Sequence, residues 1–277
     1  MARPLAAFGL LSFTYFAAIG LFSPYAPLWF QAMGLSTFAI GAIASLQSWT
    51  RIVAPYAWSW AGDHSGRRVE LIRLAALGTV LAALGLLGVG SATAVAVVTA
   101  LLFMANSGVV PLYEAVLANL LRTEQGIDAA RYGRVRVWGS VGFLVSVVAC
   151  GVLLQGLGIG AFPYVVAAVN ATMLVAALRL PSTRAEARHD EPAPPVLPML
   201  RDPRVARFFA SVFFTVLAHT AQYAFFSLYL DRLGYGKAAV GLLWALGVVA
   251  EIAFFWLQGR WMGRWEQIGL KFLPSRK

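Results

Sequence analysis

Four ionisable side chains lie inside long apolar stretches of this sequence, where a charge is costly. Arg51 and Arg136 are basic, and Glu114 and Glu251 are acidic. Within a membrane such residues pair with one another and mark the path of a solute or a proton. The four could therefore bind an anion and move a proton, or they could be structural ion pairs that hold helices together.

The depth of each charge in its apolar stretch suggests a partner for it. Glu114 lies near the end of one stretch and Arg136 near the start of the next, so consecutive antiparallel helices would bring both to a similar level. Arg51 and Glu251 are 200 residues apart and lie equally deep from the outer ends of their helices. Opposite charges at such matching places fit a central cavity between two related halves.

Two further candidates lie on polar helical stripes. His219 follows Thr215 at a helical spacing, and Trp244 precedes Glu251 in the same way. For His219 an interhelical hydrogen bond is slightly favoured over proton transfer. For Trp244 ordinary packing and stacking on a substrate are equally good interpretations. We keep Trp244 as a candidate for substrate binding and His219, with Glu114 and Glu251, for proton or charge coupling.

The sequence contains no motif of a hydrolase, a kinase or an ATP-driven pump. A glycine-rich phosphate loop ending in Lys-Ser or Lys-Thr, a His-Glu-x-x-His pair and a Gly-x-Ser-x-Gly elbow are all absent. The single cysteine, Cys150, excludes an intrachain disulfide and makes a zinc cluster implausible. We therefore expect no enzymatic activity, no cofactor and no metal site.

The elements that must position these residues are membrane helices. Of the 277 residues, 60% are hydrophobic and 12% are charged, whereas soluble domains are nearer half apolar and a quarter charged. A spanning helix needs about 20 predominantly apolar residues. Eight segments meet this requirement, roughly 5–30, 37–61, 70–90, 94–119, 134–157, 161–180, 205–230 and 238–258. The sequence thus predicts an all-α, multi-pass protein in a lipid bilayer.

The basic residues predict the orientation of these helices. The connections after the first, third and fifth segments carry no charge, whereas those after the second, fourth and sixth hold most of the arginines. The positive-inside rule then places both termini in the cytoplasm, and we expect a bacterial inner membrane. Because the net charge of +10 is spread over these short strips, nucleic acid is not an expected partner.

A shifted self-alignment divides the chain. Moving the sequence by 200 residues aligns Gly34 with Gly234 and Gly41 with Gly241, a repeat typical of secondary transporters. A second half that repeated the first would contain four further helices. The final residues could be native or the product of a frameshift. We predict a six-helix half over 1–180, a flexible cytoplasmic linker over 181–203, a partial second half over 204–258 and a cytoplasmic tail over 259–277.

Several segments resemble the major facilitator superfamily. Gly62-Asp-His-Ser-Gly-Arg-Arg68 resembles its loop between helices 2 and 3, with His64 in place of the usual first base. Tyr132–Phe143, Pro111–Ala115 and Val240–Glu251 are similar to the lactose-permease-like branch, and most similar to its 3-phenylpropionate permeases. The resemblance implies a major-facilitator-type helical bundle, and this sequence matches its six N-terminal helices and helices 7 and 8. It departs from the family in that helices 9 to 12 are missing.

In that family the loop between helices 2 and 3 belongs to the gating machinery and is not a substrate site. Its members here are Asp63, Gly66, Arg67 and Arg68. Glycine permits a tight turn at position 66. Asp63 is expected to lie against helix 3 or a nearby arginine.

The resemblance also implies roles inside the membrane. Arg136 matches a helix 5 arginine that binds substrate, and Glu114 matches its acidic partner in helix 4. Phe143 falls where the branch has an aromatic residue that stacks on the substrate. Glu251 matches the acid of helix 8, which in the family lies near the helix 5 arginine.

One function is favoured and two alternatives stay open. The favoured function is proton-coupled symport of a small organic solute, best a phenylpropionate-like aromatic carboxylate. Arg136 and Arg51 would bind the carboxylate, and Phe143 and Trp244 would bind the ring. The first alternative is a sugar or nucleoside carrier on the same scaffold. The second is a truncated fragment or subunit that transports nothing unless a complementing C-terminal half is supplied.

Overall fold

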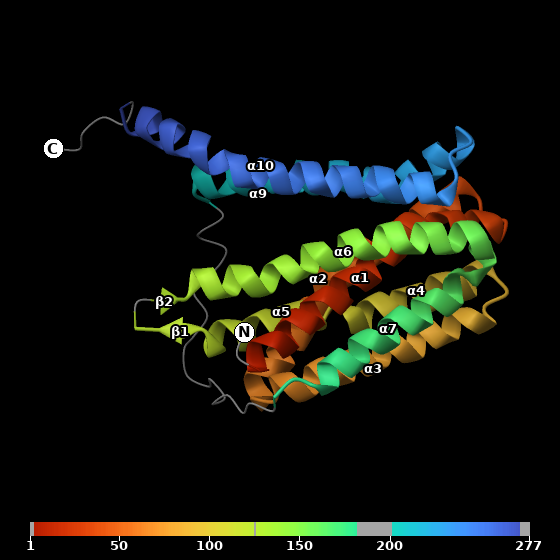
Figure 1. Ribbon diagram of the computed structural model, residues 1–277, viewed down its shortest axis with the longest axis horizontal. Helices are drawn as coiled ribbons and strands as arrows, with labels where there is room; N and C mark the ends of the chain where they lie inside the picture. The colour runs from red at the N-terminus through yellow and green to blue at the C-terminus, as the bar shows by residue number, and fades with distance from the viewer. Residues whose placement is uncertain (1–2, 125, 182–200, 272–277) are drawn as a thin grey trace.

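The computed structural model describes residues 3–124, 126–181 and 201–271, and most of them are helical (Figure 1). A short antiparallel hairpin, in which Arg122 pairs with Ile127, interrupts the helices. The elements in chain order are α1 (Arg3–Ala32), α2 (Thr37–Ser65), α3 (Arg68–Gly85), η1 (Leu86–Gly88), α4 (Ala92–Asn106), α5 (Val109–Leu120), β1 (Arg122–Thr123), β2 (Gly126–Ile127), α6 (Ala129–Leu157), η2 (Ile159–Ala161), α7 (Phe162–Leu178), α9 (Pro203–Arg232) and α10 (Lys237–Lys271).

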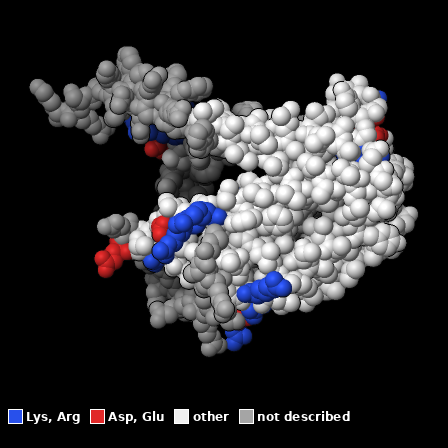
Figure 2. Space-filling model, in the orientation of Figure 1, with Lys and Arg blue, Asp and Glu red and all other residues white. Residues whose placement is uncertain are grey.

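Within the described residues, seven helical stretches are long and apolar enough to cross a membrane, with α4 and α5 counted together. α2 is 29 residues long and is not among them, since polar residues such as Gln47, Arg51 and Asp63 lower its mean hydropathy. With α2, the described chain has the eight long helices expected, and the all-α membrane fold is confirmed. On the face shown in Figure 2, charged side chains lie toward the ends of the helices, and a broad uncharged surface lies between them.

Two elements differ most from their expected bounds. The helix predicted over 94–119 is broken at Ser107 and Gly108. Pro111 explains the break, because proline has no N–H and its ring clashes with the carbonyl four residues earlier. α10 continues to Lys271, although we expected it to end near residue 258. Most of the predicted linker over 181–203 lies outside the described residues.

α1 lies at the centre of the contacts. It packs mainly against α6 and α7, while α10 lies along α6. In Figure 1, α9 and α10 run side by side and meet the other helices at the end that carries the loops 33–36 and 233–236. We call this the outer end, following the predicted orientation, and the opposite end the inner end. Several hydrogen bonds join α9 and α10 to the other helices here. The Lys237 N–H donates to Gln155 Oε1 at 2.6 Å, and Gln31 Nε2 donates to Asp231 Oδ2 at 3.3 Å.

The backbones of α1 and α6 are in direct contact. A Cβ atom on Gly142 would collide with the carbonyl of Phe13 and would lie 2.9 Å from its Cα. A Cβ atom on Gly20 would lie 2.7 Å from the carbonyl oxygen of Phe143. Small residues let membrane helices approach this closely. The contact fixes α6, and with it Arg136, against α1.

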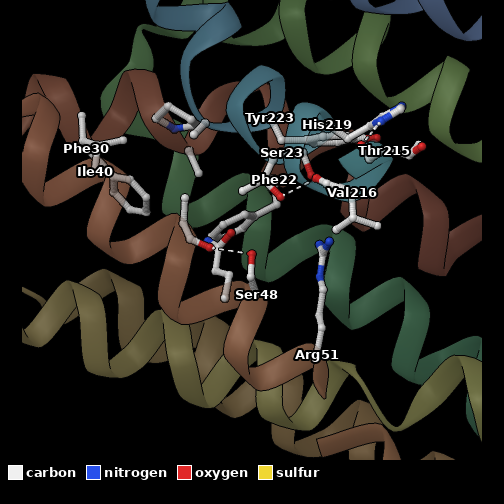
Figure 3. Close-up of a pocket in the computed structure, with 16 residues that line it drawn as sticks. Phe22, Ser23, Phe30, Ile40, Ser48, Arg51, Thr215, Val216, His219 and Tyr223 are labelled. Atoms are coloured by element: carbon white, nitrogen blue, oxygen red, sulfur yellow. Dashed lines mark hydrogen bonds between the residues drawn. The ribbon is translucent and has the colours of Figure 1, made fainter. Parts of the chain in front are cut away.

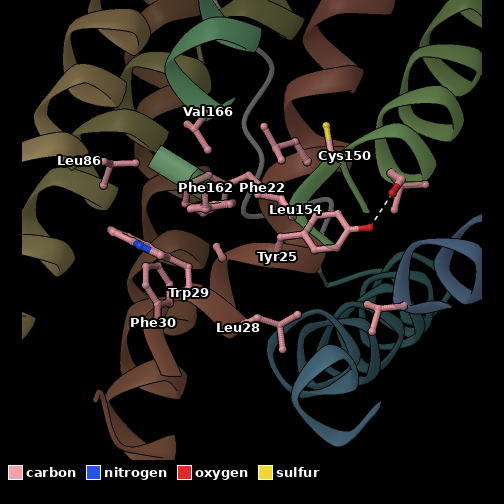
Figure 4. Close-up of a cluster of buried hydrophobic side chains, with 14 of the residues drawn as sticks. Phe22, Tyr25, Leu28, Trp29, Phe30, Leu86, Cys150, Leu154, Phe162 and Val166 are labelled. Carbon is pink, nitrogen blue, oxygen red and sulfur yellow. Dashed lines mark hydrogen bonds between the residues drawn. The ribbon is translucent and has the colours of Figure 1, made fainter. Parts of the chain in front are cut away.

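An aromatic cluster fills the outer end (Figure 4). Phe22 and Tyr25 of α1 are buried there, and the ring of Phe22 packs against Phe162 of α7. The Tyr25 hydroxyl donates to the carbonyl of Val147 in α6 at 2.6 Å and also lies 3.4 Å from the carbonyl of Lys237. Tyr25 therefore joins α1, α6 and the start of α10.

Contacts at the outer end are reciprocal. A Cβ atom on Gly241 would collide with the Tyr25 hydroxyl, and one on Gly41 would lie 3.3 Å from Phe225 Cζ. Tyr25 and Phe225 are 200 residues apart, as are the two glycines. Each aromatic ring thus lies on the glycine of the other repeat. Such reciprocity is the mark of a two-fold relation between the two parts.

Replacing Tyr25 with phenylalanine is expected to destabilise the protein by about 1 kcal/mol, the usual net contribution of one hydrogen bond. The variant keeps the ring and loses only the donor to Val147. Thermal unfolding of the purified protein in detergent would measure the change. The matched control is Tyr164→Phe, because Tyr164 is 66% exposed on α7. An equal loss in both variants would contradict the role given to the Tyr25 hydroxyl.

Candidate functional site

The loop between α2 and α3 has the geometry expected from its sequence. Gly66 ends α2 with a φ of 65°, a left-handed conformation that glycine adopts without strain. Arg68 Nη2 donates to Asp63 Oδ1 at 2.7 Å, so the acid pairs with a nearby arginine. The backbone N–H of Arg67 donates to Ser65 Oγ at 3.3 Å. The gating role of this loop stays a prediction.

Arg136 and Glu114 lie together, as their depths in the sequence suggested. Arg136 is near the start of α6 and Glu114 is on α5, and Arg136 Nε is 3.8 Å from Glu114 Oε1. This distance exceeds a hydrogen bond but permits a strong charge interaction. Each side chain is 39% exposed, so water or a solute can reach both groups. A second anion could therefore compete with Glu114 for the guanidinium.

An aromatic ring supports the guanidinium of Arg136. The Cζ atom of Arg136 lies 4.4 Å from the ring centroid of Phe16 on α1, a cation–π contact. Gly139, one turn further along α6, makes room for this arrangement. A Cβ atom there would lie 2.6 Å from Phe16 Cδ2 and 2.9 Å from Arg136 Nη1. Phe16 thus fixes one face of the arginine and leaves its edge available to anions.

Arg136 and Glu251 line one cleft between α6 and α10. The cleft has a volume of about 460 Å³, and its wall includes the side chains of Tyr132 and Ser140. Glu251 is exposed. The structure therefore gathers three of the four charges, with Glu114 paired to Arg136 and Glu251 on the same cleft as the arginine.

The fourth charge, Arg51, lines a separate cavity of about 240 Å³ between α1, α2 and α9 (Figure 3). His219 and Tyr223 of α9 line it as well. The Nδ1 atom of His219 is 2.8 Å from the Thr215 carbonyl, so this nitrogen bonds within its own helix and not between helices. The other polar side chains on the wall are Ser23, Gln47, Ser48, Thr215 and Thr220.

Arg51 extends from α2 toward Val216 of α9 in Figure 3. Its Cζ atom also lies 5.5 Å from the ring centroid of Phe103 on α4. Two tyrosines lie within electrostatic range of several of these charges. Tyr223 interacts with Arg51 and Glu251, and Tyr15 interacts with Arg51, Arg136 and Glu114. The charged residues therefore surround one central region, although they line two cavities.

The two aromatic residues predicted to bind a substrate ring are buried. Trp244 is 5% exposed, and its Nε1 atom donates to Ser227 Oγ at 2.9 Å. Its ring packs against Tyr223, with centroids 5.1 Å apart, so Trp244 supports a residue of the cavity wall. Phe143 is 7% exposed in the core, because its backbone lies against Gly20 of α1. In this conformation both residues serve packing.

Sequence reasoning did not single out Phe16, Tyr132 or Ser140. No periodic signal marks Phe16, because a phenylalanine on α1 looks like any lipid-facing or core residue. Tyr132 and Ser140 flank Arg136 at helical spacing and could have been found from that arginine. Among the described residues, no three His, Cys, Asp or Glu side chains come close enough to hold a metal ion.

Comparison with known proteins identifies the family. The sequence model of the MFS_1 like family matches residues 6–273. The chain belongs to the MFS_1 like family. The resemblance to the major facilitator superfamily seen in its motifs is thereby confirmed.

Two relatives of this MFS_1 like chain are described as transporters. It is 30% identical over 257 residues to the "Probable 3-phenylpropionic acid transporter" of Escherichia coli (strain K12), a match that covers 90% of the chain and 65% of that protein. It is 29% identical to the "Maltose permease" of Geobacillus stearothermophilus, over 97% of the chain and 67% of that protein. The chain therefore spans about two thirds of the length of these relatives.

A solved structure agrees with the fold of this MFS_1 like chain. The nucleoside transporter NupG superposes with a TM-score of 0.79 at 16% sequence identity. The superposition covers 95% of this chain and 68% of NupG. At this identity the likeness supports the fold alone. The fold is that of a multi-pass membrane protein.

Proposed function

We propose that this chain acts in proton-coupled symport of a small organic solute, with an aromatic carboxylate such as 3-phenylpropionate as the favoured substrate. The observation that carries the proposal is the accessible pair of Arg136 and Glu114, with a separation of 3.8 Å and Glu251 on the same cleft. The name of the Escherichia coli relative supports the choice of substrate.

The proposed mechanism is a competition for one guanidinium. A substrate carboxylate approaches the edge of Arg136 through the cleft and displaces Glu114, because two charge-assisted hydrogen bonds to arginine are stronger than an ion pair at 3.8 Å. The displaced Glu114 has lost its cation and accepts a proton. Solute loading and proton binding are thus linked, and both bias the same change between conformations.

The other candidate residues have supporting roles in this proposal. Glu251 balances the charge of Arg136 when Glu114 is protonated, and Arg51 with His219 provides a second polar region along the path. Trp244 acts through Tyr223 on the wall of the Arg51 cavity. The arginine-rich inner end faces the cytoplasm of a bacterial cell, and the loop from Asp63 to Arg68 acts in gating.

A sugar or nucleoside carrier is the second candidate function. The cavity around Arg51 favours it, because hydroxyl and amide groups from Ser23, Gln47, Ser48 and Thr220 suit a polyhydroxylated solute. The name of the maltose permease points the same way. Fold alone does not decide between the two, since one scaffold serves many solutes.

Uptake into proteoliposomes tests the proposal. The purified chain is reconstituted, an inward proton gradient is imposed, and labelled 3-phenylpropionate is followed with and without a protonophore. Accumulation that the protonophore abolishes, and that unlabelled aromatic acids but not maltose or uridine suppress, is the expected result. Competition by maltose or uridine would favour the second candidate.

Equilibrium binding in detergent completes the test. If 3-phenylpropionate binds but is not taken up, the chain holds the substrate site and needs a complementing half for transport. If the chain neither binds nor transports any of the three solutes, the proposed function is wrong and the third alternative, a non-transporting fragment or subunit, remains.

A further inference from the structure

The break between α4 and α5 leaves the backbone carbonyl of Met104, in the membrane span Ala92–Leu120, without its usual helical partner. In a continuous helix the Gly108 N–H would donate to Met104, but here it donates to the Ala105 carbonyl at 3.2 Å. The Met104 carbonyl instead accepts a hydrogen bond from Trp58 Nε1 of α2 at 2.9 Å. A carbonyl within a membrane span must find such a partner, because the bilayer core offers no water, so the indole stabilises the break.

The missing side chain of Gly108 makes room for this indole. A Cβ atom on Gly108 would lie 2.5 Å from Trp58 Cγ and 2.6 Å from Cδ2. Trp58 therefore packs on one residue of the break and donates to the carbonyl of another. Pro111 creates the break, and Trp58 fits into it.

α2 contacts both sides of the break. On the α4 side, the guanidinium of Arg51 lies over the ring of Phe103 at 5.5 Å. On the α5 side, a Cβ atom on Gly62 would lie 2.6 Å from Leu112 Cδ2. Arg51 and Trp58 are seven residues apart and thus share one face of α2. Trp58 lies between these two contacts and bridges the two short helices.

We propose that Trp58 is a positioning residue that holds the break between α4 and α5 and thereby sets Glu114 against Arg136. Glu114 is on α5, so its distance from Arg136 of α6 depends on the angle at the break. Movement of α2 withdraws the indole, frees the Met104 carbonyl and lets α5 turn. α2 carries the loop from Asp63 to Arg68 at one end, so the opening of that end and the pairing of Glu114 become linked.

Hydrogen–deuterium exchange of the full chain in nanodiscs tests the structural part. Trp58→Phe keeps an aromatic ring, removes the N–H donor and shortens the bicyclic indole to a single ring, a loss of volume that the control below shares. We expect exchange of the amides in 104–112 to accelerate by about 2- to 10-fold, as the loss of one hydrogen bond implies. The matched control is Trp49→Phe, because Trp49 is on the same helix and is 66% exposed. It should leave exchange in 104–112 unchanged.

Two further variants test the mechanism. Gly108→Ala displaces the indole from the other side and should reproduce the acceleration seen with Trp58→Phe. Pro111→Ala supplies an N–H for the Ser107 carbonyl and lets the helix close. In that background Trp58→Phe should accelerate exchange less than about 2-fold, because Met104 regains a backbone donor. The proposal is overturned if Trp58→Phe has no effect, if Trp49→Phe has the same effect, or if Pro111→Ala leaves the effect intact.

An uptake measurement adds a functional readout, and this part alone rests on the proposed function. Arg136 is on α6 and does not move with the break, and Glu114 competes less for it once α5 can turn, so the KM for 3-phenylpropionate in Trp58→Phe should equal that of the parent or be lower. The kcat for proton-driven uptake should fall by about 3- to 10-fold, because Glu114 is no longer held in place. A change in KM alone would contradict the role given to Trp58. Parent protein that shows no uptake would contradict the proposed function and leave the exchange result valid.

Discussion

Replacing Arg136 with alanine is expected to lower kcat/KM for 3-phenylpropionate uptake by about 10- to 100-fold. A hydrogen bond to a charged group contributes about 1.5–3 kcal/mol, and the substrate carboxylate would lose its charge-assisted donors. The guanidinium is also lost from the ring of Phe16, from whose centroid its Cζ atom now lies 4.4 Å. Uptake into proteoliposomes under a proton gradient would measure the loss.

The matched control for this variant lies half a turn away. Arg134 is exposed on the same helix, and its Nε donates to the carbonyl of Ala130 within that helix. Arg134→Ala should therefore retain uptake within about 2-fold, as is usual for an exposed charge. Equal losses in Arg134→Ala and Arg136→Ala would show that net charge, and not the site, controls uptake.

A double variant separates substrate binding from stability. Arg136→Ala leaves Glu114 beside the cleft without its cation, and an unpaired carboxylate within a membrane protein is costly. Arg136→Ala/Glu114→Gln removes that carboxylate and should recover thermal stability while uptake stays low. If the double variant recovered uptake as well, Arg136 would be a structural partner of Glu114 and would not bind the substrate.

Replacing Gly142 with valine is expected to destabilise the protein by about 3 kcal/mol or more. Overpacking in a core usually costs about 1–3 kcal/mol, and here the colliding atoms belong to the backbone of Phe13, which cannot rotate away. α6 would have to move from α1, and the guanidinium of Arg136 would move from Phe16 with it. The thermal unfolding temperature in detergent and the fraction of monodisperse protein would report the effect.

The same helix offers a control for Gly142. No side chain or neighbouring helix lies within 4 Å of a Cβ atom built on Gly156. Gly156→Ala should therefore be neutral or stabilise the protein by up to about 1 kcal/mol, because alanine is the better helix former. A Gly142→Val protein as stable as Gly156→Ala would show that α1 and α6 can move apart at little cost in stability.

Parts of the site could be predicted because depth in the membrane is a local property. Counting residues from the end of each apolar run placed Glu114 and Arg136 at one level, and they lie 3.8 Å apart. The turn at Gly66 and the pairing of Asp63 followed from the loop motif in the same way. The break at Ser107 was missed, although Pro111 indicates it, because the run from 94 to 119 is predominantly apolar on both sides of the break.

Other partners depend on which helices cross. Phe16 of α1 and Arg136 of α6 meet because the glycines between the two helices let the backbones touch. Trp58 of α2 reaches the carbonyl of Met104 because Gly108 has no side chain to block the indole. Phe143 and Trp244 carry aromatic rings at positions that suggested substrate contact, yet both rings are buried.

The sequence by itself determined that this chain is a bundle of about eight membrane helices and how deep each charge lies along its helix. Each apolar segment can span the bilayer as a helix that satisfies its own backbone hydrogen bonds, so the spans can be predicted from the local sequence alone. Only the tertiary structure decided which face each helix turns to its neighbours. Membrane helices associate through shape and small residues, because lipid is as apolar as a leucine side chain and gives no directional signal. The resulting packing places the guanidinium of Arg136 over the ring of Phe16 and the indole of Trp58 at the break before Glu114.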